Sequence, residues 1–343
     1  MKLKFAFILL FAITTIKVSA QDPIFTEYYL VPETTNPGFT GFQNTWHAGL
    51  LHRRQWPDGN RRLDTDYAFV NNMVTDKAAI GMTVMNHHEE FTNYNYLQLN
   101  GVYSYYIALN SNWGVTPGIE VGYGRKNYNF GNLLLEDQID INTGEVNRPS
   151  IDPGVLNYSN KIDFMDVSAG VVLNSEKAWV ALAVKHLTRP DIAFTENGNV
   201  PLDMLLNING GYYFELDDAP ASFLPEDCRV LVTGNYMRQS QYNRLDLGAA
   251  FEVGFFTIGA LAATNPERKS RGGHFLTSIN PVVNFSLGEF SFGYSYDIST
   301  SKLGRTQGVH ELSLVWASGH TCATCDNYKV KLKKGGVNGY ERN

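Results

Sequence analysis

Few side chains in this chain are placed to carry out catalytic chemistry. Residues 87–90 read His-His-Glu-Glu, and imidazole with carboxylate is a ligand set that transition metals accept. Four adjacent polar residues at the end of a strand are more often simply hydrated, and we favour that interpretation. His310 adjoins Glu311 and lies near Ser313, but neighbouring residues of a strand face opposite sides and do not form a nucleophile–base pair. We predict no catalytic residue, no metal site and no cofactor, and we expect that the protein is not an enzyme.

The elements that would position any site are strands with two different faces. In residues 96–109 the odd positions are mainly apolar or aromatic, whereas the even positions include Gln98, Asn100 and Ser104. The same alternation recurs in residues 244–253 and 290–298. A period of two is typical of β-strands, and about ten residues are enough for a tilted strand to cross a bilayer. These patterns predict an all-β fold, a transmembrane antiparallel β-barrel of the cell outer membrane.

The first twenty residues have the features of a secretory signal peptide. Lys2 and Lys4 precede an apolar stretch at residues 5–13, and Val18-Ser19-Ala20 offers small residues at a cleavage site. We expect the mature chain to begin at Gln21. After residue 20 no apolar run reaches the roughly 18 residues of a spanning helix. An exported protein that is integral to the membrane would then have to cross it as a closed barrel, because lipid offers no partner to an unpaired strand edge.

Composition and charge agree with this interpretation. Aromatic residues make up 13% of the chain, and charged residues make up 18%, below the usual figure of about 25%. The net charge of −6 argues against a nucleic-acid partner.

The spacing of the alternating segments predicts about fourteen strands, with short periplasmic turns and long outer loops. The predicted strands cover residues 45–55, 62–71, 78–87, 96–109, 113–126, 164–173, 178–186, 204–214, 229–238, 244–254, 255–264, 274–284, 289–298 and 308–317. The chain is thereby divided into a signal peptide (1–20), an N-terminal segment (21–44), the barrel (45–317) and a periplasmic C-terminal tail (318–343).

The inward face of the predicted barrel is polar and, on balance, acidic. The alternation directs these acidic residues into the lumen: Asp64, Asp66, Glu120, Asp166, Asp246, Glu252, Asp297 and Glu311. Arg53, Lys185 and Arg244 oppose them. Such an interior could favour cations or a basic partner. It could also be a network of internal ion pairs and hydrogen bonds, which is the interpretation we favour. The lumen of a barrel of this size has room for a plug, a ligand or a partner.

The N-terminal segment is a candidate for that plug. Pro23, Pro32 and Pro37 argue against a regular strand. We expect the segment to fold into the barrel or to lie across its periplasmic mouth, with a turn at Asn36-Pro37-Gly38. The alternative is a disordered leader.

Several motifs occur in a characteristic order along the chain. The sequence reads QDPIFTEYY at residues 21–29, TNPGFTG at 35–41, HRRQWP at 52–57, PGIEVGYG at 117–124, DQID at 137–140, HLTRP at 186–190 and GVHELSL at 308–314. This series resembles the PorP/SprF family of the type IX secretion and gliding apparatus, which typically opens with a QDPxFSQY-like stretch, an NPAYxG-like turn and a strand ending in R-x-Q-W. The motif positions that the resemblance marks as structural or partner-binding are Asn36, Pro37, Arg53, Gln55, Trp56, His186 and Pro190.

The C-terminal tail departs from the family pattern, because many members end soon after the last strand. Here a basic tail follows, with Cys322 and Cys325 separated by two residues. In an oxidising compartment a structural disulfide between them is favoured over a redox centre. Cys228 is predicted on the same side of the membrane, so its pairing with one of the tail cysteines remains open.

The resemblance implies an outer-membrane barrel of the type IX secretion system. In such members the barrel is linked to the surface delivery or anchoring of a large secreted adhesin, so the expected partners are the C-terminal domain of that adhesin, type IX components and outer-membrane lipid. A passive outer-membrane transporter or porin for small or hydrophobic solutes is the alternative, because fold alone does not determine function.

Overall fold

The computed structural model describes residues 21–57, 62–128, 134–146, 149–151, 158–195, 198–216, 228–267, 275–300 and 308–318. The predicted signal peptide, the cysteine pair Cys322 and Cys325 and nearly all of the predicted tail lie outside the described residues. Among the described residues, no helix is both long enough and apolar enough to cross a bilayer.

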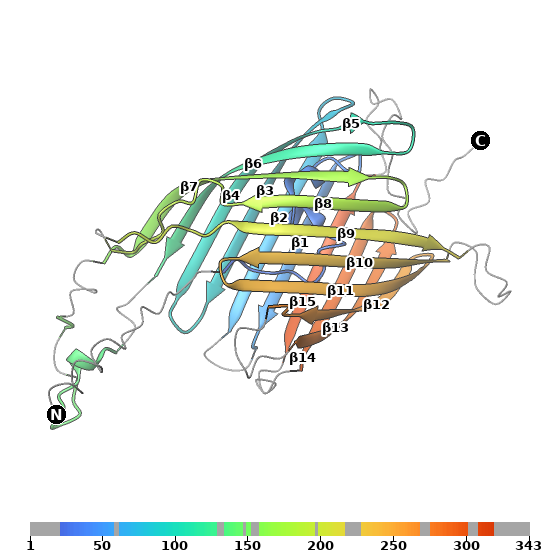
Figure 1. Ribbon diagram of the computed structural model, residues 1–343. Helices are drawn as coiled ribbons and strands as arrows, with labels where there is room; N and C mark the ends of the chain where they lie inside the picture. Colours follow the sequence, from blue (N-terminus) through green and yellow to red (C-terminus); the bar gives the residue numbers. More distant parts are fainter. Residues whose placement is uncertain are drawn as a thin grey trace, which may run out of the picture.

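Fourteen antiparallel spans close into one barrel, as the sequence predicts (Figure 1). The sheet has fifteen strands because one span is interrupted at Tyr106, and both of its parts, β4 and β5, pair with β6. β1 pairs with β2 on one side and with β15 on the other, so the barrel closes at a seam between its first and last strands. The strands are β1 (His47–Gln55), β2 (Leu63–Met73), β3 (Ala78–Glu89), β4 (Tyr94–Tyr105), β5 (Ile107–Ala108), β6 (Gly114–Asn127), β7 (Lys161–Asn174), β8 (Ala178–Lys185), β9 (Leu205–Glu215), β10 (Cys228–Gln239), β11 (Tyr242–Val253), β12 (Phe256–Thr264), β13 (Leu276–Leu287), β14 (Phe290–Ser299) and β15 (Val309–Ala317).

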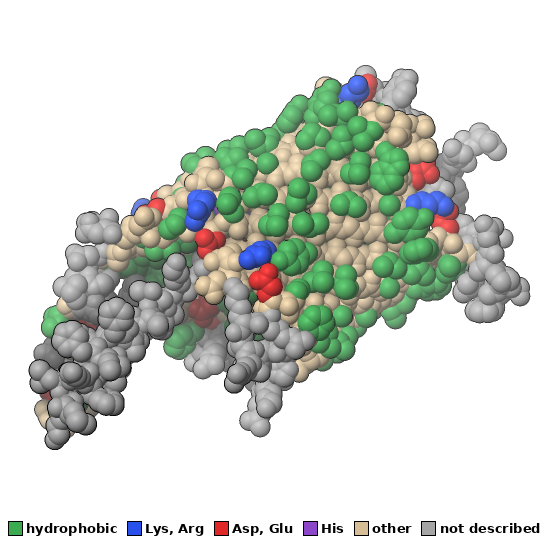
Figure 2. Space-filling view, in the orientation of Figure 1, with side chains coloured by type: hydrophobic (Ala, Val, Ile, Leu, Met, Phe, Trp, Pro, Cys, Tyr) green, Lys and Arg blue, Asp and Glu red, His purple; other side chains and the backbone are tan. Residues whose placement is uncertain are grey.

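The two faces of the strands differ as the alternation predicts. On β4 the side chains of Leu99 and Tyr103 are exposed on the outside, whereas Gln98, Asn100 and Ser104 are buried inside. Figure 2 shows apolar side chains over the middle of the visible outer face, with charged side chains towards the ends of the strands. An apolar band flanked by polar ends is the surface that a bilayer requires of a barrel.

The connections at the two ends of the barrel differ in length. The periplasmic turns are mostly short, and those at residues 254–255 and 288–289 begin with Gly254 (φ 56°) and Gly288 (φ 57°). Two-residue hairpins favour glycine because their backbone needs a positive φ. The outer connections include the long loops 128–160 and 186–204. Three connections depart from this rule: the periplasmic loop 216–227 is long, and the outer turns 90–93 and 240–241 have only four and two residues.

The N-terminal segment, residues 21–44, folds inside the barrel (Figure 1). It contains no strand and turns through two short 3₁₀ helices, η1 (Pro32–Thr34) and η2 (Pro37–Phe39). Its apolar side chains complete a hydrophobic core within the lumen, where Phe25 and Val31 join Tyr67, Phe69 and Tyr96 of the barrel wall. The barrel is therefore closed around a packed interior.

Two of the carboxylates that the sequence directs into the lumen, Asp64 and Asp66, face outward instead. Asp66 accepts a hydrogen bond from His52 Nδ1 at 2.7 Å, and Asp64 one from Arg54 Nε at 2.8 Å, both on the outside of β1 and β2. On β2 the apolar side chains face the lumen, because the N-terminal segment supplies an apolar partner there. The rings of Phe25 and Tyr67 lie 5.8 Å apart. The other predicted inward residues line or fill the interior.

We predict that Gly118→Ala loosens the N-terminal segment, whereas Gly101→Ala does not. A Cβ atom at Gly118 would lie 2.5 Å from the backbone carbon of Pro37, whereas one at Gly101 would meet nothing within 4 Å. Overpacking of this kind costs about 1–3 kcal/mol. Proteinase K digestion of outer membranes, with the N-terminal sequence read by mass spectrometry, should show faster clipping of residues 21–44 in the first variant only. Equal clipping rates in the two variants would contradict the tight contact.

Candidate functional site

The polar contacts between the barrel wall and the N-terminal segment form the candidate functional site. The first group centres on Arg53 of β1, whose guanidinium donates to Asp297 Oδ2 of β14 and to Glu311 Oε2 of β15, each at 2.7 Å. All three side chains are buried. An arginine in this position satisfies two carboxylates that water cannot reach, because its planar fork carries several donors.

The same carboxylates bind the N-terminal segment. The backbone N–H groups of Thr26 and Glu27 donate to the two oxygens of Glu311 at 3.0 and 2.7 Å. The hydroxyl of Thr26 donates to Asp297 Oδ1 at 2.8 Å, and it also accepts from Arg53 at 3.1 Å. The segment is therefore bonded to the barrel on both sides of the seam.

Glu27 adds a second carboxyl to this group, and it accepts a hydrogen bond from Ser313. Burial, together with the nearby carboxylate of Glu311, raises the pKa of Glu27 well above its usual range. A protonated Glu27 carries no charge, so it can lie beside Glu311 without the repulsion that two buried carboxylates would exert.

The second group centres on His186, which follows the end of β8. Its Nδ1 lies 2.6 Å from Asp166 of β7, and its Nε2 lies 2.6 Å from Asp22 of the N-terminal segment. Burial opposes the charged imidazole, but Asp22 and Asp166 raise the pKa of His186 to about 9. Burial likewise opposes the charged form of Asp22, but His186 lowers the pKa of that carboxyl to about 2. The imidazolium therefore links wall and segment as an ion bridge.

The backbone of His186 adopts a left-handed conformation, with φ of 59°. This region is uncommon for a residue with a side chain, and it is retained where the surroundings impose it. Here the two carboxylates hold the ring while the chain turns out of β8 into the long loop 186–204. Leu202 and Ile192 of that loop are buried in the same apolar core as Phe25.

A third group holds the turn at Asn36, which is fully buried. Its side chain accepts from the N–H of Gly38 at 2.8 Å and donates to the carbonyl of Leu182 at 2.9 Å. Nearby, Glu33 accepts hydrogen bonds from the Asn71 side chain and from His47 Nδ1, at 3.0 and 2.9 Å. Pro37 begins the 3₁₀ helix η2, where its fixed φ and missing N–H suit the first position.

The remaining predicted residues lie elsewhere. Gln55 ends β1, and Trp56 beyond it is 41% exposed and has a φ of 52°. The backbone N–H of Trp56 donates to the carbonyl of Gly308 across the seam at 3.3 Å. The carbonyl of Pro190 accepts from Leu202 within the loop 186–204 at 2.9 Å. The motif residues therefore divide between contacts with the N-terminal segment and the outer end of the barrel. Within the described part of the chain Cys228 is buried as a free thiol, and the two tail cysteines with which it could pair lie outside that part.

The acidic residues of the N-terminal segment are the site residues that the sequence analysis did not single out. Asp22, Glu27 and Glu33 each bind a residue of the wall. The available signal is a charge asymmetry, because residues 21–44 contain these three acids and no Lys or Arg. Such a segment suits a wall that supplies Arg53, Lys185 and His186.

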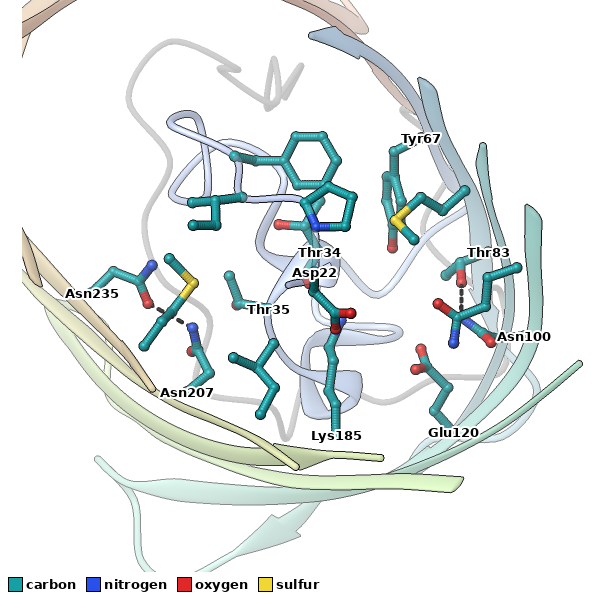
Figure 3. Close-up of a pocket in the computed structure, with 17 residues that line it drawn as sticks. Asp22, Thr34, Thr35, Tyr67, Thr83, Asn100, Glu120, Lys185, Asn207 and Asn235 are labelled. Atoms are coloured by element: carbon teal, nitrogen blue, oxygen red, sulfur yellow. Dashed lines mark hydrogen bonds between the residues drawn. The ribbon is translucent and has the colours of Figure 1, made fainter. Parts of the chain in front are cut away.

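Some open space remains between the N-terminal segment and the barrel wall. Figure 3 shows a cavity beside Asp22, Lys185, Glu120 and Tyr67, and its volume is about 40 Å³. Lys185 donates to the carbonyl of Thr34 at 2.8 Å, so this cation also binds the segment. A cavity of that volume accommodates a few water molecules. Within the described part of the chain, no group of three or more His, Cys, Asp or Glu side chains could hold a metal ion.

One known family and several solved structures are similar to this chain. The family model for the type IX secretion system membrane protein PorP/SprF matches residues 17–316. The chain is similar to the Acinetobacter baumannii outer membrane protein Omp33 (TM-score 0.43, 8% identity, 80% of this chain and 98% of that chain). It is also similar to a Pseudomonas aeruginosa FadL homologue (TM-score 0.40, 11% identity, 82% and 92%). No curated protein matches the chain. The family match and the barrel's apolar outer face place the chain in the outer membrane.

We predict that Arg53→Met destabilises the barrel by about 3–5 kcal/mol, because it leaves two buried carboxylates unpaired. The matched control is Arg238→Met on β10, since Arg238 is 48% exposed where it pairs with Glu267. An exposed pair contributes only about 0–1 kcal/mol. Loss of the heat-resistant band on semi-native gels should occur at a clearly lower temperature for Arg53→Met alone. Identical unfolding temperatures for the two variants would refute a structural role for the Arg53 group.

We also predict that the N-terminal segment loosens in alkali. The stability that His186 contributes is complete below its ordinary pKa of about 6.5, and it is lost as pH rises through about 9. The contribution of Asp22 is complete above about pH 4 and is lost only as pH falls through about 2. Clipping of residues 21–44 by proteinase K should therefore be several-fold faster at pH 9.5 than at pH 6, after correction for protease activity on casein. His186→Gln should remove most of this difference, and an unchanged pH profile would disprove the ion bridge.

Proposed function

The chain belongs to the PorP/SprF family of type IX secretion system membrane proteins, and from this membership we propose that it is a non-enzymatic binding protein of that system. It binds a secreted adhesin through the adhesin's C-terminal domain and anchors or delivers it at the cell surface, in support of gliding motility. Its other contacts are with secretion components and with outer-membrane lipid.

The observation that carries this proposal is the filled lumen. Residues 21–44 occupy the interior through three groups of buried polar contacts and a shared apolar core. A barrel of this kind offers a partner its loops and its rims. Its role is then to hold or present another protein at the membrane surface, as an anchoring component of a secretion system does.

The alternative is a passive transporter for small or hydrophobic solutes. Transport through the lumen would require the N-terminal segment to leave or to shift, because residues 21–44 occupy the interior through buried polar and apolar contacts. Displacement would also expose the charges of Asp297, Glu311 and Asp166 inside the barrel. The two functions therefore differ in a measurable property, which is conductance.

The deciding experiment combines a pull-down with a conductance measurement. The full chain, tagged at its C-terminus, is solubilised from outer membranes of cells that secrete type IX cargo, and co-purified proteins are identified by mass spectrometry. We expect recovery of a large secreted adhesin or of type IX components. The purified barrel should leave a planar bilayer non-conducting.

A tagged barrel of the same size from outside this family serves as the control for non-specific capture. Recovery of the same proteins with that control would refute the anchoring function. A barrel without companions that conducts ions or solutes would overturn it in favour of transport.

A further inference from the structure

The outer loop between β6 and β7 exposes apolar side chains to water. We call residues 134–146 the β6–β7 tip. The tip, drawn in green, projects beyond the ends of β6 and β7 in Figure 1, so it lies outside the strands that form the barrel wall. Ile141 is 94% exposed, Leu134 56%, Val146 54% and Ile139 39%. Large apolar side chains gathered in one exposed segment commonly mark a binding surface.

Internal hydrogen bonds hold the β6–β7 tip in shape. A 3₁₀ helix, η5 (Glu136–Gln138), is fixed by the side chain of Gln138, which accepts from the N–H of Leu135 at 2.9 Å. Ile139 and Val146 face each other in an antiparallel bridge. The Asp140 N–H donates to the carbonyl of Glu145 at 2.9 Å. The apolar side chains are therefore presented by a folded unit, which reduces the entropy lost when a partner binds.

A further contact ties the tip to the returning chain. The carboxylate of Asp137 accepts a hydrogen bond from the N–H of Ile151 at 2.6 Å. Ile151 is itself 65% exposed. This bond brings a fifth large apolar residue towards the tip and fixes where the chain leaves it.

The negative charge of the β6–β7 tip determines which kind of surface it can bind. Residues 134–146 contain four acids, at positions 136, 137, 140 and 145, and no Lys or Arg. Anionic lipid headgroups repel such a segment, so insertion of the exposed isoleucines into the outer leaflet is disfavoured. A protein surface with apolar side chains bordered by Lys or Arg is complementary to both features of the tip, and opposite charges also speed the encounter.

We propose that the β6–β7 tip is a docking surface for a secreted protein that presents an apolar patch bordered by basic residues. The inference rests on the proposed function and specifies which part of the barrel meets the cargo. Ile141 and Val146 supply the apolar contact, and the carboxylates around them supply orientation and specificity.

The test compares tagged full-length barrels in the pull-down described above. The double variant Ile141→Ser, Val146→Ser should recover at least about tenfold less of the secreted protein than the unmodified barrel, because a few buried apolar side chains dominate a typical interface. The control Asn142→Ser changes a polar residue of the same tip and should recover an amount within about twofold of the unmodified barrel. Glu136→Lys reverses one charge and should lower recovery several-fold at low salt. Equal heat resistance on semi-native gels confirms that each variant is folded.

The outcomes separate the two proposals. If the unmodified barrel recovers a secreted protein and the double variant recovers as much, the docking surface is refuted and the anchoring function stands. If the unmodified barrel recovers type IX components but no secreted protein, the docking surface is refuted and the association with the secretion system stands. If it recovers neither, both proposals are refuted. A lipid target is tested with nanodisc-embedded barrels and phosphatidylglycerol vesicles: co-flotation that the double variant abolishes would overturn the protein partner.

Discussion

The ion pairs of Arg53 with Asp297 and Glu311 join β1, β14 and β15 to the N-terminal segment at one buried point. Each of these charges would be costly to bury alone, and each is stabilised because the others are present. Glu311 also accepts the backbone N–H groups of Thr26 and Glu27, so the path of the segment depends on the orientation of this one carboxylate. The remaining contacts, at His186 and at Asn36, hold the segment on either side of the residues that the Arg53 group binds.

Charge explains why this segment and this wall fit each other. The wall contributes cations at Arg53, Lys185 and His186, and the segment contributes only acids. At His186, the segment's Asp22 adds a second carboxylate to the Asp166 that the wall already supplies. Between the polar groups, Phe25 and Val31 pack against wall aromatics. The interior therefore resembles the core of a soluble domain built of polar and apolar layers, enclosed by a barrel whose apolar surface faces lipid.

Most of the barrel could be predicted from the sequence, because the two-residue period is a local property that can be recognised in each strand independently. The outer positions Leu99 and Tyr103 and the inner positions Gln98 and Asn100 lie where the alternation places them. The errors at Asp64 and Asp66 have a non-local cause. Tyr67 and Phe69 turn inward to meet Phe25, and nothing within β2 signals that an apolar partner will occupy the lumen. The ion bridge of His186 is non-local in the same way, since Asp22 lies far from it in the chain. The motifs mark Arg53 and His186 as notable positions, but they do not name the groups that these side chains bind.

The position of the Arg53 group at the seam has a consequence for how the barrel forms. Arg53 and Glu311 come from the first and last strands, so their contact forms when the barrel closes. Closure joins the strands with the largest sequence separation, and the loss of conformational entropy is therefore greatest at this step. The N-terminal segment precedes β1 and is bonded to both sides of that seam. Because Thr26 contacts both Arg53 of β1 and Glu311 of β15, the segment is placed to bring the two strands of the seam together. Closure of the barrel and seating of the segment are therefore coupled through the same buried group.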